Sequence, residues 1–467
     1  MKLTEFSVAQ LQQALRSGEL SAMEIADATL TAIEQHNPRI NAWTTISSDR
    51  MRREADRLDR LRRDGQPLPP LAGVPYAVKN LFDVAGERTL AGASLFSDRP
   101  PAAHDAWAVD RLSQAGALLS GMLNMDAYAY GFTTENSHYG ATRNPHDLQR
   151  IAGGSSGGSA AAVSAGLVHF SLGSDTNGSI RVPASLCGIF GLKPTFGRLS
   201  RHGTHPFVAS LDHIGPFARN TDDLTRVYDA LQGLDREDAF QADVAPQPAL
   251  PQLEKGLEGL RCAVLGGYFQ QWSDENAQQA VATAARALEA SELLELDEME
   301  IARSAAFILT AAEGGNRYLP ALRSQPERFE PLSRERLLAG ALLPSAWYLQ
   351  AQRFRRYFQQ KVLALFDHFD VLIAPATPCS ATLIGQETML INGQTLPVRA
   401  SMGMLTQPIS FLGLPVTTVP LQTASGLPIG LQLIAAPFQE ANCLRAARVL
   451  EQLGIASAPV ASLEGNG

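Results

Sequence analysis

Cysteine, lysine and long apolar runs are all scarce in this chain of 467 residues. Its cysteines form no C-x-x-C pair, so the sequence predicts neither a zinc site nor a disulfide framework. The longest apolar run, near residues 159–170, is too short and small-sided to span a bilayer. The N-terminus reads as an amphipathic helix rather than a signal peptide. We therefore expect a protein of the reducing cytoplasm that has no membrane partner. The four cysteines are Cys187, Cys262, Cys379 and Cys443.

Basic clusters are also missing. The net charge is −8 and no run of lysine or arginine occurs, so a nucleic-acid partner has no electrostatic support. A hydrophobic fraction of 45% and a charged fraction of 18% are typical of a soluble globular enzyme. Only five of the 39 basic residues are lysines, so a lysine in an apolar setting, such as Lys79, is a candidate for a special role.

The pattern of the first half of the chain predicts helices followed by an α/β layered region. Residues 4–66 have helical periodicity, and residues 159–167 suit a small-sided helix packed closely against a sheet. Short apolar runs separated by helical segments favour strands in an α/β fold. The runs expected to form strands are 76–84, 117–124, 170–176 and 188–195.

The second half begins with a surface linker, 239–255, which is rich in proline, alanine and glutamine. A strand is expected at 260–268, helices over most of 276–366, and strands again at 371–378 and 414–435. Because strands at both ends share one style, we predict one large mixed sheet with a helical insertion, within a single domain spanning 1–467. Its parts would be a helical region 1–66, a catalytic core 67–235, a substrate-side region 257–370, and C-terminal strands with a helix at 371–460.

Two bursts of glycine and serine, I-A-G-G-S-S-G-G-S at 151–159 and G-S-D-T-N-G-S-I-R at 173–181, are the most informative local feature. Neither ends in G-K-S or G-K-T, and no G-x-G-x-x-G occurs, so phosphate-binding loops are excluded. A flexible linker is excluded because an apolar helix follows the first burst at once. In the second burst, the backbone amides of Thr176, Asn177, Gly178 and Ser179 would form a nest able to hold an oxyanion.

A serine nucleophile needs a base in contact with it. No histidine lies in either burst, and no G-x-S-x-G elbow occurs. Lys79, in G-V-P-Y-A-V-K-N-L-F, is therefore the better candidate base. Two interpretations of it stay open: a strand-end lysine that reaches water, or a desolvated lysine whose pKa falls from ~10.4 towards ~7–8. Five histidines are expected in loops or in supporting positions: His138, His146, His202, His205 and His213.

Several longer motifs resemble those of the amidase signature family over roughly residues 5–455. The motifs are GVPYAVKNLFD, NMDAYAYGFTTENSHYGATRNP, GGSSGGSAAAVSAG, GSDTNGSIRVPASLCGIFGLKPTFGRLS and GLPIGLQLIA. The resemblance implies the α/β fold of that family, a large mixed twisted β-sheet covered by helices on both faces. It also implies a Ser–Ser–Lys triad that uses no cofactor or metal. Ser179 would be the acyl-forming nucleophile, Ser155 a proton relay that follows a cis peptide bond, and Lys79 the base.

One residue departs from the family pattern, because many members have glycine where this chain has Asn177. Asparagine tolerates a positive φ better than other residues that carry a side chain. With the segments RFEPLSRERLLAG and AWYLQAQRFRR, the T-N-G-S variant resembles family members of s-triazine catabolism. We therefore expect release of ammonia from a small carboxylated ureide such as 1-carboxybiuret. The alternatives are the glutaminase subunit of a tRNA-dependent amidotransferase and an allophanate hydrolase-like amidase.

A carboxylated substrate calls for an arginine, whose guanidinium binds carboxylates in a bidentate manner. Arg336 matches the position at which glutamine-using relatives hold the substrate's carboxylate. Tyr318, Arg323 and Met125 of the N-M-D motif are further candidates for substrate binding, together with Asn177. A surface salt bridge is the simpler interpretation of Arg323. In the second burst, Asp175 is expected to accept hydrogen bonds from loop amides, and Arg181 is expected to brace the loop.

Partners are predicted only from the resemblance. The two enzyme types that the chain resembles most pair with a small helical subunit, so a companion of that kind and homodimerisation of the amidase are expected. A role in assembly, with a vestigial pocket, is the alternative from another class of function. The intact positions Lys79, Ser155 and Ser179 argue against it.

Overall fold

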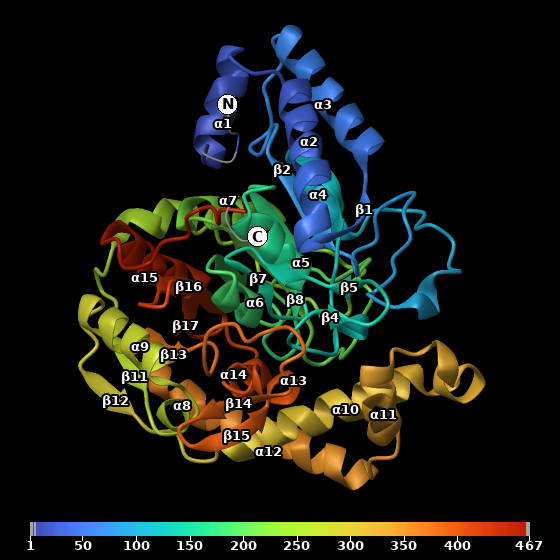
Figure 1. Cartoon of the computed structure of the whole chain (residues 1–467). Helices are drawn as coiled ribbons and strands as arrows, with labels where there is room; N and C mark the ends of the chain where they lie inside the picture. The colour runs from blue at the N-terminus through green and yellow to red at the C-terminus, as the bar shows by residue number, and fades with distance from the viewer. Residues whose placement is uncertain (1–2, 4–5, 464–467) are drawn as a thin grey trace.

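A single mixed sheet of eleven strands forms the centre of the computed structural model, which describes residue 3 and residues 6–463 (Figure 1). This confirms the predicted α/β class and the predicted large mixed sheet. In spatial order the strands are β1 (Trp43–Ile46), β3 (Leu118–Leu123), β2 (Pro75–Lys79), β8 (Phe170–Asp175), β10 (His213–Ala218), β9 (Phe190–Lys193), β16 (Val416–Gln422), β17 (Pro428–Ile434), β13 (Val371–Pro375), β11 (Cys262–Leu265) and β12 (Glu292–Leu294).

Parallel strands bring Lys79 and the second glycine–serine burst to one edge of the sheet. Strand β2 lies between β3 and β8 and runs parallel to both, with Tyr76 opposite Phe170. Parallel strands end at the same edge of a sheet, where ligands commonly bind. Lys79, the last residue of β2, therefore lies beside the loop that follows β8. The segment 76–84 was expected to be one strand, but β2 ends at Lys79.

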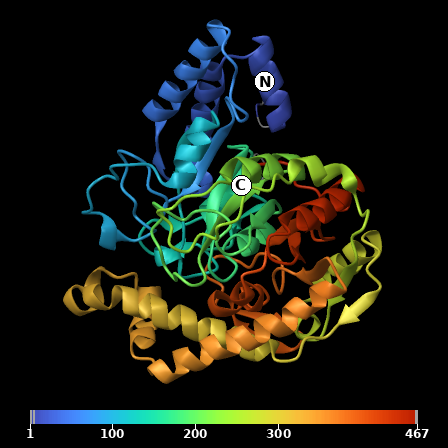
Figure 2. The same ribbon diagram turned by 180° about the vertical axis from the view of Figure 1, so that it is seen from behind.

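Two helical layers pack on the sheet (Figures 1 and 2). In one layer α4 contacts α7, α7 contacts α15 and α15 contacts α9; in the other α5 contacts α6. Helix α5 consists of glycine, alanine, serine and valine, so it lies close to the neighbouring backbone: a Cβ on Gly158 would lie 2.6 Å from the Asn124 carbonyl oxygen. The bounds are α4 (Trp107–Gln114), α5 (Gly157–Ser164), α6 (Arg181–Leu186), α7 (Thr221–Leu231), α9 (Glu275–Ala287) and α15 (Glu440–Gln452).

The N-terminal helices gather at one end of the molecule (Figure 1). Helices α1 (Val8–Ser17) and α2 (Ala22–Ile40) each begin with a capping box, in which the side chains of Ser7 and Ser21 accept hydrogen bonds from the first turn. Helix α3 (Ser48–Arg63) follows. The sequence predicted only helix here, but Trp43–Ile46 pairs with β3 as an edge strand, because its β-branched residues suit a half-buried strand.

Long helices form the opposite end of the molecule (Figure 1) and carry part of the site. They are α10 (Met299–Ser324), α11 (Pro331–Ala341) and α12 (Ser345–Leu363). Glycines allow α10 and α11 to touch through their backbones: a Cβ on Gly340 would overlap the Ala311 carbonyl oxygen, and one on Gly315 would overlap the Ala341 nitrogen. This close approach fixes the position of α11, on which Arg336 lies. Within the segment predicted to be helical, Glu292–Leu294 is instead the edge strand β12.

The remaining elements are short. Three two-stranded sheets pair β4 (Glu135–Asn136) with β5 (Gly140–Ala141), β6 (Arg143–Asn144) with β7 (Asp147–Ile151), and β14 (Thr388–Ile391) with β15 (Gln394–Pro397). The other short helices are α8 (Tyr268–Gln271), α13 (Val398–Ser401), α14 (Gln407–Leu412), and the 3₁₀ turns η2 (Ser94–Phe96), η3 (Ala127–Ala129), η4 (Leu250–Lys255), η5 (Pro326–Arg328) and η6 (Ala364–Asp367). Among the described residues, none of the helices combines the length and apolarity that crossing a bilayer requires.

Candidate active site

Lys79 is completely buried and its amine lies among serine hydroxyls. The Nζ atom is 2.6 Å from Ser155 Oγ, 3.0 Å from Ser156 Oγ and 2.9 Å from Ser174 Oγ. Across residues 3 and 6–463, no carboxylate forms an ion pair with it. The interpretation of Lys79 as a strand-end lysine that reaches water is therefore wrong, because β2 ends beneath the two glycine–serine loops rather than at the surface.

Burial lowers the pKa of Lys79 to about 7, since a charged amine loses its hydration there. Three buried carboxylates, Asp126, Asp175 and Asp212, oppose this shift by favouring the charged form. Burial is the larger effect. Near neutral pH a substantial share of the molecules therefore carries an uncharged amine, whose lone pair can accept a proton from a neighbouring hydroxyl.

Ser155 follows a cis peptide bond with Gly154, as the resemblance implied. Its hydroxyl contacts Lys79, while its carbonyl oxygen accepts a hydrogen bond from the Asp126 amide at 3.2 Å. Only glycine fits at position 154, because a Cβ there would overlap the Asp126 carboxylate. The paired glycines of the first burst thus let the chain pass close to Asp126 while it presents Ser155 to the lysine.

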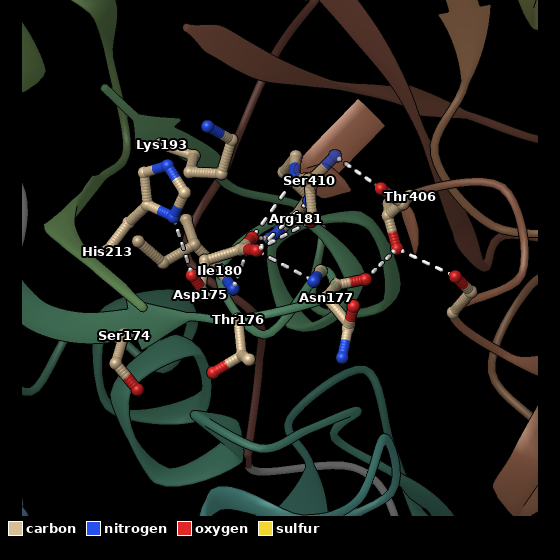
Figure 3. A network of polar contacts seen from close by, with 12 residues as sticks. Ser174, Asp175, Thr176, Asn177, Ile180, Arg181, Lys193, His213, Thr406 and Ser410 are labelled. Atoms are coloured by element: carbon tan, nitrogen blue, oxygen red, sulfur yellow. Dashed lines mark hydrogen bonds and ion pairs between the residues drawn. The ribbon is translucent and has the colours of Figure 1, made fainter. Parts of the chain in front are cut away.

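An ion pair inside the second burst holds the loop that carries Ser179 (Figure 3). The Asp175 carboxylate accepts hydrogen bonds from the Gly178 amide at 2.7 Å and the Ile180 amide at 3.1 Å. The Arg181 guanidinium contacts both carboxylate oxygens at 3.0 Å and also reaches Gln432. Burial alone would raise the pKa of Asp175, but Arg181 holds it well below its ordinary value. Asp175 and Arg181 thus have the bracing contacts that the sequence predicted.

The contact with Asp175 corrects the expected set of oxyanion donors. Because the Gly178 N–H already donates to the carboxylate, it is not free to bind a developing oxyanion. Thr176, Asn177 and Ser179 are left as candidates. The reason expected for tolerating asparagine also differs: Gly178 adopts the positive φ of 135°, and Asn177 is not among the described residues with positive φ. Asn177 therefore requires no left-handed backbone.

Ser179 borders a small pocket together with Thr176, Asn177 and Arg336. Its side chain forms no hydrogen bond within the described part of the chain, so the structure shows no direct bond from Ser179 to Ser155. The Arg336 guanidinium lies 3.7 Å from the centre of the Tyr130 ring and donates to the Tyr130 carbonyl at 3.3 Å. It forms no ion pair with a described carboxylate. The other lining residues are Ala129, Tyr130, Gly131, Phe132, Phe207, Phe307, Thr310, Ala400 and Gln407.

Three residues expected to bind substrate do not line this pocket. The Tyr318 hydroxyl hydrogen-bonds to His205 at 2.9 Å, and its ring lines a separate depression with Arg99 and Arg317. Arg323 is exposed in the last turn of α10. Met125 is completely buried in the main hydrophobic core. Each is drawn away by its place in the fold: α10 turns the first two outward, and the N-M-D segment buries the third.

Histidines take supporting positions, as expected. His213 contacts the Asp175 carbonyl oxygen at 3.0 Å, and burial lowers its pKa. Burial likewise lowers the pKa of His205 to about 3. Neither forms a hydrogen bond to Ser155 or Ser179, and both are poor proton acceptors, so the lysine remains the better candidate base.

Sequence reasoning missed several residues of the site. Ser156 and Ser174 lie within the two bursts, and their closeness to Ser155 and Asp175 in the chain could have indicated contact with Lys79. Thr310 and Gln407 could not have been found in this way. They come from α10 and α14, more than a hundred residues away in the chain, and only the packing of these helices brings them to the pocket.

The fold and the site are those of an amidase signature enzyme, a hydrolase of amide bonds. The chain belongs to that family, since the family model described as Amidase matches residues 24–444. Among characterised relatives it is similar to AtzE, the 1-carboxybiuret hydrolase subunit of Pseudomonas sp. (strain ADP), with 55% identity over 449 residues, which cover 96% of this chain and 98% of the relative. A subunit of the glutamyl-tRNA(Gln) amidotransferase of Moorella thermoacetica is 36% identical over 479 residues, covering 97% of each chain.

Solved structures agree with this assignment. A structure described as "An unexpected vestigial protein complex reveals the evolutionary origins of an s-triazine catabolic enzyme" has a TM-score of 0.96 and 54% identity, covering 97% of this chain and 100% of the other. A structure described as "Crystal structure of amidase" has a TM-score of 0.85 and 32% identity, covering 96% of this chain and 100% of the other. The chain is thus an amidase signature hydrolase closely related to 1-carboxybiuret hydrolase.

Proposed function

We propose that this amidase releases ammonia from a small carboxylated ureide such as 1-carboxybiuret, using Ser179, Ser155 and Lys79. The observation that carries the proposal is the contact of Lys79 Nζ with Ser155 Oγ at 2.6 Å, made by a completely buried lysine whose pKa lies at about 7. Ser179 on the wall of the adjacent pocket supports its role as the nucleophile. The 55% identity to a 1-carboxybiuret hydrolase subunit supports the substrate.

The first half-reaction forms an acyl-enzyme. Neutral Lys79 accepts the proton of Ser155 as Ser155 takes the proton of Ser179, and Ser179 Oγ attacks the amide carbonyl. The negative charge that develops on the carbonyl oxygen is stabilised by free amides of Thr176, Asn177 and Ser179. When the intermediate collapses, the C–N bond breaks. The leaving nitrogen takes a proton that returns from the Lys79 ammonium through Ser155, so it departs as ammonia.

The second half-reaction repeats the relay with water. A water molecule loses a proton through Ser155 to Lys79 and attacks the acyl carbonyl. The ester bond to Ser179 then breaks, and Ser179 regains its proton by the same route. The three groups therefore return to their starting protonation states, and no further reactant is needed.

Arg336 supplies the charge that a carboxylated substrate requires. Its guanidinium borders the same pocket as Ser179, and no carboxylate of the described chain neutralises it. Burial lowers the pKa of Arg336, although its ordinary value is so high that the group stays charged. An unpaired, largely buried cation favours an anionic ligand, because an anion restores the interactions that it lost with water.

Ammonia release from a panel of amides tests the proposed substrate. We expect turnover of 1-carboxybiuret and allophanate to exceed that of neutral biuret, and glutamine to be a poor substrate. Arg336→Gln is the matched variant: it should lower kcat/KM for carboxylated members ~10–100-fold, as expected for loss of a charge-assisted hydrogen bond. The same variant should leave biuret nearly unaffected. Turnover of glutamine alone would favour the amidotransferase alternative, to which the second relative corresponds.

We also propose that the amidase dimerises and binds a small helical companion protein. The support is the high similarity to a structure described as a vestigial protein complex. Native mass spectrometry of the tagged chain, purified from cells that contain its natural neighbours, should show a small protein bound in stoichiometric amount. A lone chain with full activity and stability would contradict this proposal.

A further inference from the structure

The side chain of Asn177 presents a buried acceptor that has no partner. Its Oδ1 atom is shielded from solvent and accepts no hydrogen bond from the described protein atoms. Asn177 lines the pocket two residues before Ser179, and its side chain points away from the Asp175–Arg181 network in Figure 3. A buried polar atom without a partner is costly, so such an atom in an active-site pocket indicates that a ligand supplies the partner.

Thr310 fixes which end of the Asn177 amide is unpaired. The Thr310 hydroxyl donates its only proton to the Ala306 carbonyl at 2.8 Å, within α10. Its oxygen is therefore left to accept, and it accepts from Asn177 Nδ2 at 2.8 Å. A flipped amide would set Oδ1 against the oxygen of Thr310 with no proton between them. The free atom is thus the oxygen, and its missing partner must be a donor.

Neither of the two polar side chains nearest in function provides that donor. The contacts of Arg336 go to Tyr130, and Gln407 Oε1 accepts from Arg303 at 3.2 Å. The pocket therefore offers a ligand one unpaired acceptor near the nucleophile and one unneutralised cation. A matching ligand carries an N–H close to the scissile carbonyl and a carboxylate further away.

We propose that Asn177 Oδ1 accepts a hydrogen bond from the N–H that joins the scissile carbonyl to the carboxylated part of the substrate. Asn177 would then select ureides over plain amides, in which a CH₂ group occupies this position. This inference rests on the proposed function, because it assumes that Ser179 attacks a terminal amide whose carboxylate Arg336 binds. A CH₂ substrate would leave Oδ1 buried and unpaired, and sites built around a substrate N–H or O–H reject analogues that lack it.

Allophanate and malonamate form the matched pair for the test. Both have a terminal amide and a carboxylate at the same separation, and they differ only in NH or CH₂ between the two carbonyl carbons. Because their intrinsic reactivities differ, the readout is how each variant changes the ratio of kcat/KM for allophanate to kcat/KM for malonamate. We expect Asn177→Ala and Asn177→Gly to lower this ratio ~10–100-fold, the effect of losing one buried hydrogen bond.

Thr310 provides a second, independent pair of variants. Thr310→Val removes the hydroxyl that orients the amide and should lower the same ratio, whereas Thr310→Ser keeps the hydroxyl and should preserve it. Thermal unfolding of each variant shows that the fold persists. If the ratio stays unchanged in Asn177→Ala, Asn177→Gly and Thr310→Val while both compounds are hydrolysed, the inference is overturned and the proposed function stands. If the wild-type enzyme hydrolyses neither compound, both fail together.

Discussion

Replacing Ser179 by alanine is expected to lower kcat/KM for ammonia release at least ~10⁴-fold, the loss typical of removing a catalytic nucleophile. The fold should persist, because the Ser179 hydroxyl forms no hydrogen bond within the described part of the chain and no partner is left unpaired. The measurement is steady-state ammonia release, with thermal unfolding of the same sample.

Ser174→Ala is the matched control for this variant. It removes one of the three hydroxyls around Lys79 but leaves the nucleophile and the Ser155 contact in place. Its loss of activity should be much smaller than that of Ser179→Ala. A Ser179→Ala enzyme that retains a tenth of the wild-type rate would contradict the proposed nucleophile. An unchanged biological function in that variant would favour the alternative role in assembly.

The pH dependence of kcat/KM should report the protonation of Lys79. The base acts only when neutral, and its pKa is lowered to about 7. Activity should therefore fall about tenfold per pH unit well below 7 and level off above it. Lys79→Arg, which stays protonated at every accessible pH, should lose at least ~10³-fold across the whole range, because general-base catalysis contributes about that much.

Asp126→Asn tests the assignment of that pH limb. Asp126 favours the charged form of Lys79, so removing its charge should move the limb to lower pH. The shift has a definite sign, which a change in folding or substrate binding would not reproduce at unaltered maximal rate. A flat profile between pH ~5 and ~9, or a limb near the ordinary lysine value of ~10.4, would contradict the role of Lys79.

Local signals in the sequence predicted much of the fold and part of the site. The strands β2, β3, β8 and β9 lie within apolar runs that were expected to be strands, because burial on both faces leaves a clear pattern. The edge strands β1 and β12 were missed, since they are short and half-exposed and their sequences lack that pattern. The single-domain interpretation and the cytoplasmic location remain predictions.

Within the site, glycine and serine were informative because they serve a local backbone need. The cis bond before Ser155 and the amide acceptor role of Asp175 could be predicted from the bursts and the family resemblance. Tyr318, Arg323 and Met125 could not be rejected from sequence. Their side-chain directions depend on how α10 and the N-M-D segment pack, and no neighbouring residue in the chain encodes that packing.

The sequence by itself determined the kind of chemistry, because the two bursts and Lys79 specify a crowded backbone, two hydroxyls and an amine. Tertiary structure decided the state of those groups and the shape of their surroundings. Burial of Lys79 sets its pKa, and the Asp175 contact withdraws the Gly178 amide. The packing of α10 brings Thr310 to Asn177 and leaves one oxygen unpaired. Desolvation and hydrogen-bond partners arise only when distant segments meet, so only the folded chain could show which acceptor is left for the substrate.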